Sequence, residues 1–416
     1  MIGHRCSITR AMRRCLRPRS LRFHATMSQT SAEVFEENSL PRWGRRRYYP
    51  VRIGDIYKDR YRIITKLGFG AHSTVWLARG ERRSCYATLK VCTVEPNGPD
   101  PAVANEIKML DYIKACPRED GGLTYLRLAE DKFELHGPHG QHDCLVMRPQ
   151  GCSYMTLQRH FDAYRLPKEF VVDLVTRLMV CLDWLHGGCG IVHTDISATN
   201  VLVGMEDDQV FARLEQDEKN SPSMPTKVDD HDIYPSRGNP DSIYDVATGK
   251  IVLTDFGSAR LIQDEHRGWC MPDTHRAPEV LMGLPWNWKV DIWSVGITAL
   301  ELLEGRHLFY PIDHRDNKYV LPIAVAQYIS YLGPPPLHMV ERSGNPSIKA
   351  LFDGNGQWVG PITIPDNALE DFVTAIPEGD QKVLFLDLIR KMLVWDPEER
   401  GDAADVFHHE WFQSYN

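Results

Sequence analysis

Two short segments that lie far apart in the chain constrain its fold more than any other feature. Residues 193–200 read HTDISATN and residues 254–257 read TDFG. They supply a carboxylate that can orient a hydroxyl group (Asp195) and two oxygen ligands for a metal ion (Asn200 and Asp255). Each residue type is common alone, but chance is a poor explanation for the ordered composite pattern. The chain therefore has to fold so that these distant segments meet.

The part of the chain upstream of these segments favours strands. Residues 61–64, 73–77 and 86–91 alternate and are rich in β-branched types, which predicts an antiparallel strand set. Residues 102–114 instead carry apolar side chains at helical spacing. A later apolar run ends in Arg-Pro-Gln-Gly, and this junction predicts a hinge at 147–150.

A glycine-rich turn, LGFGAHSTV at 67–75, lies between the first two predicted strands. Gly68 and Gly70 would let backbone amides approach phosphate oxygens, which a Cβ atom would block. Any hairpin uses glycines, and Ser73 stands where a third glycine is usual. The turn alone is therefore a weak indication of a phosphate site.

Lys90 ends a predicted strand, and Glu106 lies on the predicted helix that follows. A lysine that binds phosphates needs a carboxylate to orient its ammonium group, and Glu106 is placed to do this. The alternative is an ordinary surface ion pair, worth about 0–1 kcal/mol. The order of Lys90 after the glycine-rich turn favours the functional interpretation.

Beyond the hinge the sequence is mainly helical. Apolar residues recur at helical spacing over 171–185 and lead into His193, whose ring we expect to pack rather than to bind a ligand. Residues from about 205 to 247 are rich in Asp, Glu, Asn, Ser and Pro, and we expect a disordered or loosely ordered insertion there. These patterns predict a chain of class α+β, with a β-rich part up to the hinge and a mainly helical part beyond it.

Charge is distributed unevenly along the chain. Residues 1–47 carry eleven Arg, no Lys and three Glu, a net charge of +8; the whole chain carries −8, so residues 48–416 carry −16. An acidic body suits a basic partner, such as an arginine-rich peptide, better than nucleic acid. The plain alternative is that the acidic surface serves solubility.

Residues 1–47 are interpreted as a basic extension outside the fold, disordered or involved in targeting. Their Arg-rich start fits a mitochondrial transit peptide, and the alternatives are translation from Met27 or a disordered tail. The ten cysteines form no CxxC pair, which indicates a reducing compartment, so we expect the cytoplasm or nucleus unless the N-terminus directs mitochondrial import. No apolar run is long enough to predict a membrane-spanning helix.

Three further segments complete a pattern that resembles the eukaryotic protein kinases from about Ile56 to Phe412. They are RAPE at 276–279, DIWSVG at 291–296 and DPEER at 396–400. The resemblance implies a bilobal kinase fold, with a small β-rich lobe over 56–150 and a large helical lobe over 151–412. It also implies that the protein uses ATP and Mg²⁺. Asp195 and Lys90 would be the catalytic residues, and Asn200 and Asp255 would bind the metal ion.

The same resemblance assigns roles to other positions. The nucleotide-binding positions that it implies are Leu67, Gly68, Gly70, Val75, Lys90, Glu106, Met147, Asn200 and Asp255. Met147 would close the back of the adenine pocket. Glu279 and Arg400 would form a buried ion pair, and Asp291 would anchor the backbone of the catalytic loop.

Within that family, the chain most resembles the SR-protein kinases, especially their compact fungal members. The matching segments are YPVRIGD at 49–55, STVWLA at 73–78 and HTD at 193–195, together with an insertion between Leu202 and Ile251. The resemblance implies protein substrates rich in Arg and Ser, of the kind found in splicing proteins. We expect no direct binding of nucleic acid or membrane, and a monomeric state.

Several positions depart from the usual kinase pattern. Ser197 stands where serine/threonine kinases place a Lys that neutralises the transferring phosphate, and residues 193–200 contain no Lys or Arg. Losing such a group costs on the order of 10²–10³ in rate, by analogy with other transition-state donors. Thr88 replaces a small Ala beside the adenine. Pro272 replaces a Thr that binds the catalytic Asp, and Thr274 is two residues out of register.

Thr194 replaces the Arg that usually pairs with an activation-loop phosphate, which predicts activity without that phosphorylation. The predicted function is that of a serine/threonine protein kinase, and the alternative is a pseudokinase that binds nucleotide as a scaffold with weak or no catalysis. A small-molecule kinase is disfavoured by the Ala-Pro-Glu and Asp-Ile-Trp-Ser segments, by family analogy.

Overall fold

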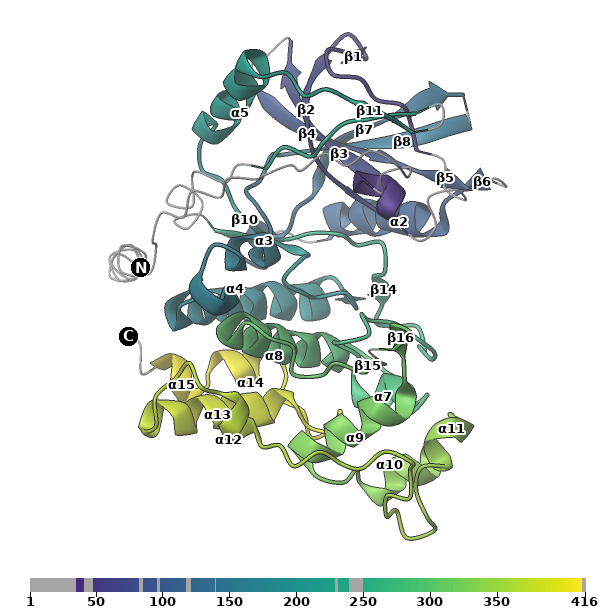
Figure 1. Cartoon of the computed structure of the whole chain (residues 1–416), viewed down its shortest axis with the longest axis vertical. Coiled ribbons are helices and arrows are strands. Elements are labelled where there is room, and N and C mark those ends of the chain that lie inside the picture. The colour runs from purple at the N-terminus through teal and green to yellow at the C-terminus, as the bar shows by residue number, and fades with distance from the viewer. Residues whose placement is uncertain are drawn as a thin grey trace.

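The chain forms two lobes that stack along its longest axis (Figure 1). The computed structural model describes residues 35–40, 48–81, 85–95, 98–116, 121–138, 140–228, 231–238, 250–313 and 315–413. The upper lobe contains the main sheet, and the lower lobe is built mainly from helices. This is the α+β bilobal fold predicted from the sequence.

Six antiparallel strands build the upper lobe. In spatial order they are β1 (Ile56–Tyr57), β2 (Tyr61–Gly70), β3 (Ser73–Gly80), β4 (Tyr86–Cys92), β8 (Gly140–Met147) and β7 (Ala129–Gly137). Because successive side chains point to opposite faces, Trp76 and Leu89 pack in a core on one face. Leu77 and Leu145 belong instead to the large core that continues into the lower lobe. The three strands predicted from alternation are all present.

Helix α2 (Pro101–Ala115) follows the short strands β5 (Val94–Glu95) and β6 (Gly98–Pro99). Asp100 caps it by accepting a hydrogen bond from the Ala102 amide, and a proline occupies the first helical position. Val103 and Leu110 are buried, and Glu106 lies between them on the same buried side. The helix predicted from apolar spacing therefore forms, and its packing turns Glu106 inward.

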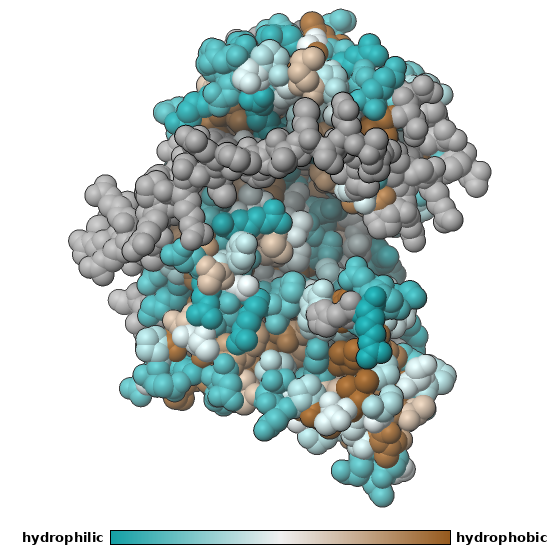
Figure 2. Space-filling model, in the orientation of Figure 1, coloured by the Kyte–Doolittle hydropathy of each residue, from teal (hydrophilic) through white to brown (hydrophobic). Residues whose placement is uncertain are grey.

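The lower lobe is organised around α8, in which every residue from Val290 to Glu304 is buried. Its helices are α3 (Tyr154–Gln158), α4 (Lys168–Asp183), α7 (Pro278–Leu281), α8 (Lys289–Glu304), α9 (Leu321–Leu332), α10 (Leu337–Arg342), α11 (Pro346–Lys349), α12 (Leu369–Phe372), α13 (Asp380–Met392), α14 (Ala403–Phe407) and α15 (Glu410–Gln413). In the described part of the chain, no helix is long and apolar enough to cross a membrane. Figure 2 shows mostly hydrophilic side chains on this face, with apolar ones gathered on the lower lobe around α9.

Short strand pairs explain how the two signature segments meet. β9 (Ile191–Val192), which leads into His193, pairs with β14 (Arg260–Leu261), and β10 (Val201–Val203) pairs with β13 (Ile251–Leu253), which leads into Asp255. A further pair, β15 (Ile312–Asp313) and β16 (Lys318–Tyr319), lies in the lower lobe. Both ends of each signature loop are thus tied to the other loop by backbone hydrogen bonds.

The expectation of a loosely ordered insertion at 205–247 is wrong for residues 205–228 and 231–238. They form helix α5 (Gln209–Asn220) and the hairpin β11 (Thr226–Val228) with β12 (His231–Ile233), and α5 lies beside β2 (Figure 1). Glu218 is buried, where it accepts a hydrogen bond from Thr65 of β2 and pairs with Arg237. The polar composition misled the prediction because these charges are used in buried contacts. Residues 239–249 lie outside the described residues.

Residues 35–40 also contradict the expectation that the first 47 residues stay outside the fold. They include the short helix η1 (Glu36–Ser39), and both Glu36 and Glu37 contact the ammonium group of Lys66, a fully buried residue of β2. Glu36 also accepts hydrogen bonds from the backbone and hydroxyl of Ser236 in the insertion. The rest of the predicted N-terminal extension, apart from this segment, lies outside the described residues.

A buried ion pair links α7 to the C-terminal part of the lower lobe. Arg400 contacts Glu279 with both terminal nitrogens, at 2.8 and 2.9 Å, and both side chains are fully buried. Arg400 also donates to the carbonyl oxygens of Lys289 and Val394. This is the pair that the family resemblance implied, and its bidentate geometry offsets the cost of removing two charges from water.

Substituting Glu279→Ala is expected to lower the free energy of unfolding by about 3–5 kcal/mol, because Arg400 would keep its buried charge without a counterion. Chemical denaturation followed by tryptophan fluorescence measures the change. Glu370→Ala is the matched control, since Glu370 pairs with Arg390 at a half-exposed position and should contribute only about 0–1 kcal/mol. Equal losses in the two variants would contradict this prediction.

Candidate functional site

Lys90 lies on β4, between Val75 of β3 and Leu145 of β8 in the sheet register. Its ammonium nitrogen contacts both carboxylate oxygens of Glu106, at 2.6 and 2.7 Å. Burial opposes the charge on Lys90, but Glu106 and then Asp255 outweigh this effect and raise the pKa of Lys90. The lysine therefore keeps its positive charge. The ion pair between Lys90 and Glu106 is largely buried, unlike the ordinary surface ion pair that was the alternative interpretation of the sequence.

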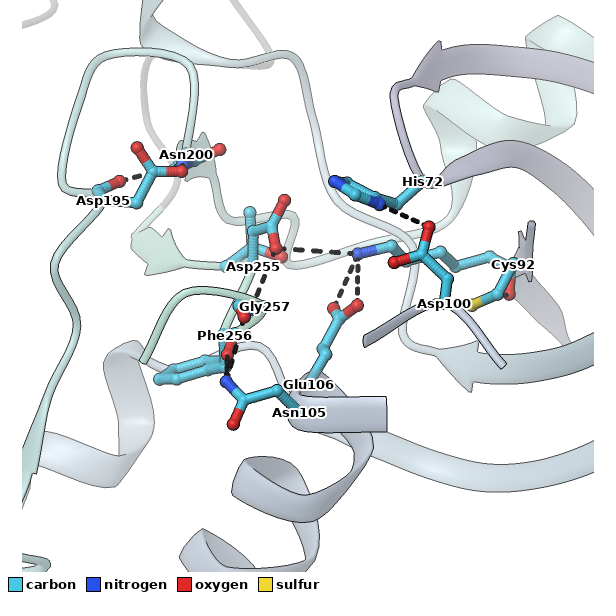
Figure 3. Close-up of polar contacts among 12 residues, drawn as sticks. His72, Cys92, Asp100, Asn105, Glu106, Asp195, Asn200, Asp255, Phe256 and Gly257 are labelled. Carbon is cyan, nitrogen blue, oxygen red and sulfur yellow. Dashed lines mark hydrogen bonds and ion pairs between the residues drawn. The ribbon is translucent and has the colours of Figure 1, made fainter. Parts of the chain in front are cut away.

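Asp255 follows β13 and faces the same lysine. Its Oδ1 lies 3.9 Å from the Lys90 ammonium nitrogen and accepts a hydrogen bond from the Gly257 amide (Figure 3). Lys90 lowers the pKa of Asp255 against the opposing effect of burial. The backbone of Asp255 is left-handed, with φ of 70°, a conformation that costs a non-glycine residue on the order of 1–3 kcal/mol. The protein therefore maintains an ionised carboxylate on a strained turn.

Asn105, on α2 directly before Glu106, fixes this turn. Its amide nitrogen donates to the carbonyl oxygens of Gly257 and Ala259, at 2.9 and 3.0 Å. Phe256 is fully buried, and the edge of its ring meets His193. Sequence reasoning missed Asn105, although its position next to Glu106 on one helix turn was a usable signal.

Asp291, at the start of α8, organises the catalytic loop from the interior. It accepts hydrogen bonds from the backbone amides of His193 and Thr194, both at 2.8 Å, and its Oδ2 lies 2.9 Å from Nε2 of His186. Thr194 has a φ of 67°, and its hydroxyl donates to the carbonyl oxygen of Ser258. Thr194 thus connects the catalytic loop directly to the Asp255 turn.

Asp195 and Asn200 lie together on the loop that Asp291 supports (Figure 3). The Asn200 amide nitrogen donates to both the backbone oxygen and Oδ2 of Asp195, at 2.8 Å each. Burial, with a contribution from Asp255, raises the pKa of Asp195 above its ordinary value. The environments of Asp195 and Asp255 thus move their pKa values apart, which suits one carboxylate to accept a proton and the other to bind a cation.

The remaining positions that were predicted to bind nucleotide lie on the strands of the main sheet. Gly68 and Gly70 have open space where a Cβ would stand, so packing alone does not require glycine at either position. Leu67 and Val75 are partly buried, and Met147 is buried at the end of β8, in register with Thr88. The hydroxyl of Thr88 is buried and has no hydrogen-bond partner.

Two of the departures from the family pattern can be placed. Thr274 does not replace the missing threonine in the described contacts, because its hydroxyl lies 3.0 Å from Nδ1 of His275. Ser197 lies on the catalytic loop between Asp195 and Asn200, so this loop offers its hydroxyl where a cation is usual.

The donor set around Asp255 fits a magnesium ion that is shared with phosphate groups. Because the Asn200 amide nitrogen is already bonded to Asp195, its oxygen is the atom available to a metal ion. Asn200 and Asp255 then offer oxygen ligands only, which is the preference of Mg²⁺. Among the described residues no group of three or more His, Cys, Asp or Glu could bind a metal by itself. Phosphate oxygens and water would have to complete the coordination, as in other sites where Mg²⁺ accompanies a nucleotide.

Comparisons with known proteins agree with this geometry. The family described as "Protein kinase domain" matches residues 61–412. A serine/threonine protein kinase of Aspergillus fumigatus is 35% identical over 92% of this chain and 91% of its own. The serine/threonine-protein kinase SRPK of Physarum polycephalum is 29% identical over 87% and 88%, and the protein kinase dsk1 of Schizosaccharomyces pombe is 24% identical over 88% and 83%.

The raised pKa of Asp195 has a measurable consequence. A group that must accept a proton works only when ionised, so kcat should fall as the pH drops through a value above the ordinary aspartate pKa of 3.8. The pH dependence of kcat, with circular dichroism at each pH to show that the chain stays folded, measures this. An acid limb at or below 3.8 in folded protein would show that the site does not perturb this carboxyl group.

Proposed function

Because this chain belongs to the protein kinase family, we propose that it transfers the γ-phosphoryl group of ATP to serine and threonine hydroxyls of other proteins. The observation that carries the proposal is the convergence of Lys90, Asp195, Asn200 and Asp255 from three separate segments: strand β4, the loop at 193–200 and the turn after β13. Glu106 positions Lys90, which in turn lies 3.9 Å from Asp255. Asp291 binds the backbone of the loop on which Asp195 and Asn200 contact each other.

Each residue has a distinct part in the proposed reaction. Lys90 binds phosphate oxygens of ATP, and Asn200 and Asp255 would hold Mg²⁺, which supplies positive charge to the phosphates when bound. Asp195 orients the substrate hydroxyl and accepts its proton. The hydroxyl oxygen forms a bond to the γ-phosphorus while the bond to the β–γ bridging oxygen breaks, and ADP leaves with that electron pair.

The pseudokinase alternative rests mainly on Ser197. Against it, the lysine, the proton acceptor and both metal ligands are all present, and each has an ordered partner in the site. Thr194 also argues for activity, because its hydroxyl bond to Ser258 joins the catalytic loop to the metal-binding turn without an activation-loop phosphate. Turnover separates the two functions, since both predict nucleotide binding.

Arginine- and serine-rich protein segments are the substrates that we favour. Residues 48–416 carry a net charge of −16, which attracts basic peptides. One relative is named SRPK, and the sequence resembles the same group. The proposal is for this class of peptide.

Phosphate transfer from radiolabelled Mg·ATP to an Arg/Ser-repeat peptide should occur with the full chain and vanish in Asp195→Ala, because the variant lacks the proton acceptor. Asp217→Ala is the matched control, since Asp217 lies on the exposed side of α5 and should leave the rate unchanged. If the parent is silent but still binds a fluorescent nucleotide, the pseudokinase alternative holds.

The Michaelis constant for that peptide should rise steeply with salt, since the attraction between exposed charges is screened over about 8 Å at 0.15 M ionic strength. Measuring it at several sodium chloride concentrations, beside an uncharged serine peptide, tests the acidic-surface argument. The argument fails if salt affects both peptides equally.

A further inference from the structure

His72 lies at the tip of the glycine-rich turn, between β2 and β3, where a buried carboxylate binds its ring. The ring Nδ1 lies 2.7 Å from Asp100 Oδ2, and the carbonyl oxygen of His72 accepts a hydrogen bond from the Thr93 amide at 2.9 Å. The Asp100 side chain is 2% exposed, whereas that of His72 is 38% exposed. The contact therefore joins a surface ring to a fixed point in the interior.

Asp100 is itself positioned by three groups. Its Oδ1 accepts a hydrogen bond from the Ala102 amide at 3.0 Å, and its Oδ2 accepts one from the Thr93 hydroxyl at 3.2 Å as well as contacting His72. It is the capping residue of α2, the helix that also carries Glu106. The helix that orients Lys90 thus orients His72 as well.

The direction of the ring follows from this contact. With Nδ1 bound to Asp100, Nε2 lies at the opposite side of the ring. Figure 3 shows one ring nitrogen of His72 facing Asp100 and the other on the side of the view where Asp255, Asn200 and Asp195 are drawn. His72 is also among the groups that lower the pKa of Asp255, after the larger effects of Lys90, the Gly257 amide and His193.

The loop at 193–200 offers no cationic side chain to the site. Residues 193–200 contain no Lys or Arg, and Ser197 occupies the position from which a cation would reach the transferring phosphate. An imidazolium donates from both nitrogens, so one histidine can bond a carboxylate with Nδ1 and a phosphate oxygen with Nε2. Hydrogen bonds between ionised groups are about twice as strong as neutral ones.

We propose that His72 is a catalytic residue whose Nε2 donates a hydrogen bond to the γ-phosphate of ATP, with Asp100 as the positioning residue, and that it supplies the charge which Ser197 cannot. The inference rests on the proposed function and deepens it. His72 gains and loses no proton in the transfer: the proton of the substrate hydroxyl goes to Asp195, and the electron pair of the broken P–O bond goes to ADP.

The competing interpretation is that the contact between His72 and Asp100 only ties the turn to α2. The two interpretations predict different effects of a His72 substitution on the binding of ATP and ADP. A γ-phosphate donor should matter for ATP and not for ADP, whereas a structural tie should matter equally for both.

Isothermal titration calorimetry of the full chain with Mg·ATP and Mg·ADP tests this without any need for turnover. His72→Phe, which keeps a ring but removes the donor, should weaken ATP binding about tenfold and leave ADP binding within about twofold. His136→Phe makes the same change at an exposed position on edge strand β7 and should alter neither. Thermal unfolding of each variant checks that the fold is intact. Equal losses for ATP and ADP would overturn the proposal.

A rescue experiment asks whether His72 replaces the missing lysine. Ser197→Lys should raise kcat about tenfold or more in the His72→Phe background and by less than about threefold in the parent, because two groups that serve one phosphate are not additive. Asp100→Asn keeps a good helix cap but removes the counterion, and it should lower kcat less than His72→Phe does. Equal effects of Ser197→Lys in both backgrounds would contradict the proposal.

The two proposals fail in different ways. If the parent chain transfers no phosphate, the kinase activity is refuted. If the same chain prefers ATP over ADP and His72→Phe loses this preference, the γ-phosphate contact is still supported. An active parent whose nucleotide preference is unchanged in His72→Phe refutes the role of His72 alone.

Discussion

The geometry of the site depends on one buried carboxylate. Asp291 lies on α8, whose residues are almost all buried, and it binds two consecutive backbone amides of the catalytic loop. Because a buried carboxylate must satisfy its lone pairs, the loop has little freedom to move away from it. That constraint supports the left-handed backbone of Thr194, places Asp195 and Asn200 beside each other, and lets Thr194 reach Ser258 next to the metal-binding turn.

The upper lobe contributes to the site through α2. Three polar side chains on this helix or at its N-terminal cap contact the candidate site: Asp100 binds His72, Asn105 binds the Asp255 turn, and Glu106 binds Lys90. A displacement of the helix would therefore disturb the glycine-rich turn, the metal-binding turn and the lysine together. The insertion and residues 35–40 contact β2 through buried charges, so they support the sheet on which the glycine-rich turn depends.

Much of the fold and of the site could be predicted, because it follows from patterns among residues that are close together in the sequence. Alternation identified β2, β3 and β4, helical spacing identified α2 and α4, and the ordered signature residues identified the family. The insertion could not be predicted in this way. Its composition resembles that of disordered chains, yet Glu215 binds Tyr86 and Arg79, and Glu218 binds Thr65, through contacts between residues far apart in the sequence. The same limit hid the pairing of His72 with Asp100.

The sequence by itself determined the fold class, the family and the residue types available for phosphate transfer, because periodicity and ordered spacing are properties of the chain alone. Only the tertiary structure decided which charges are buried, which carboxylates have raised or lowered pKa values, and which side chain faces the site in place of a lysine at 197. Those properties depend on distance and on exclusion of water, and both arise only when segments distant in the chain pack together.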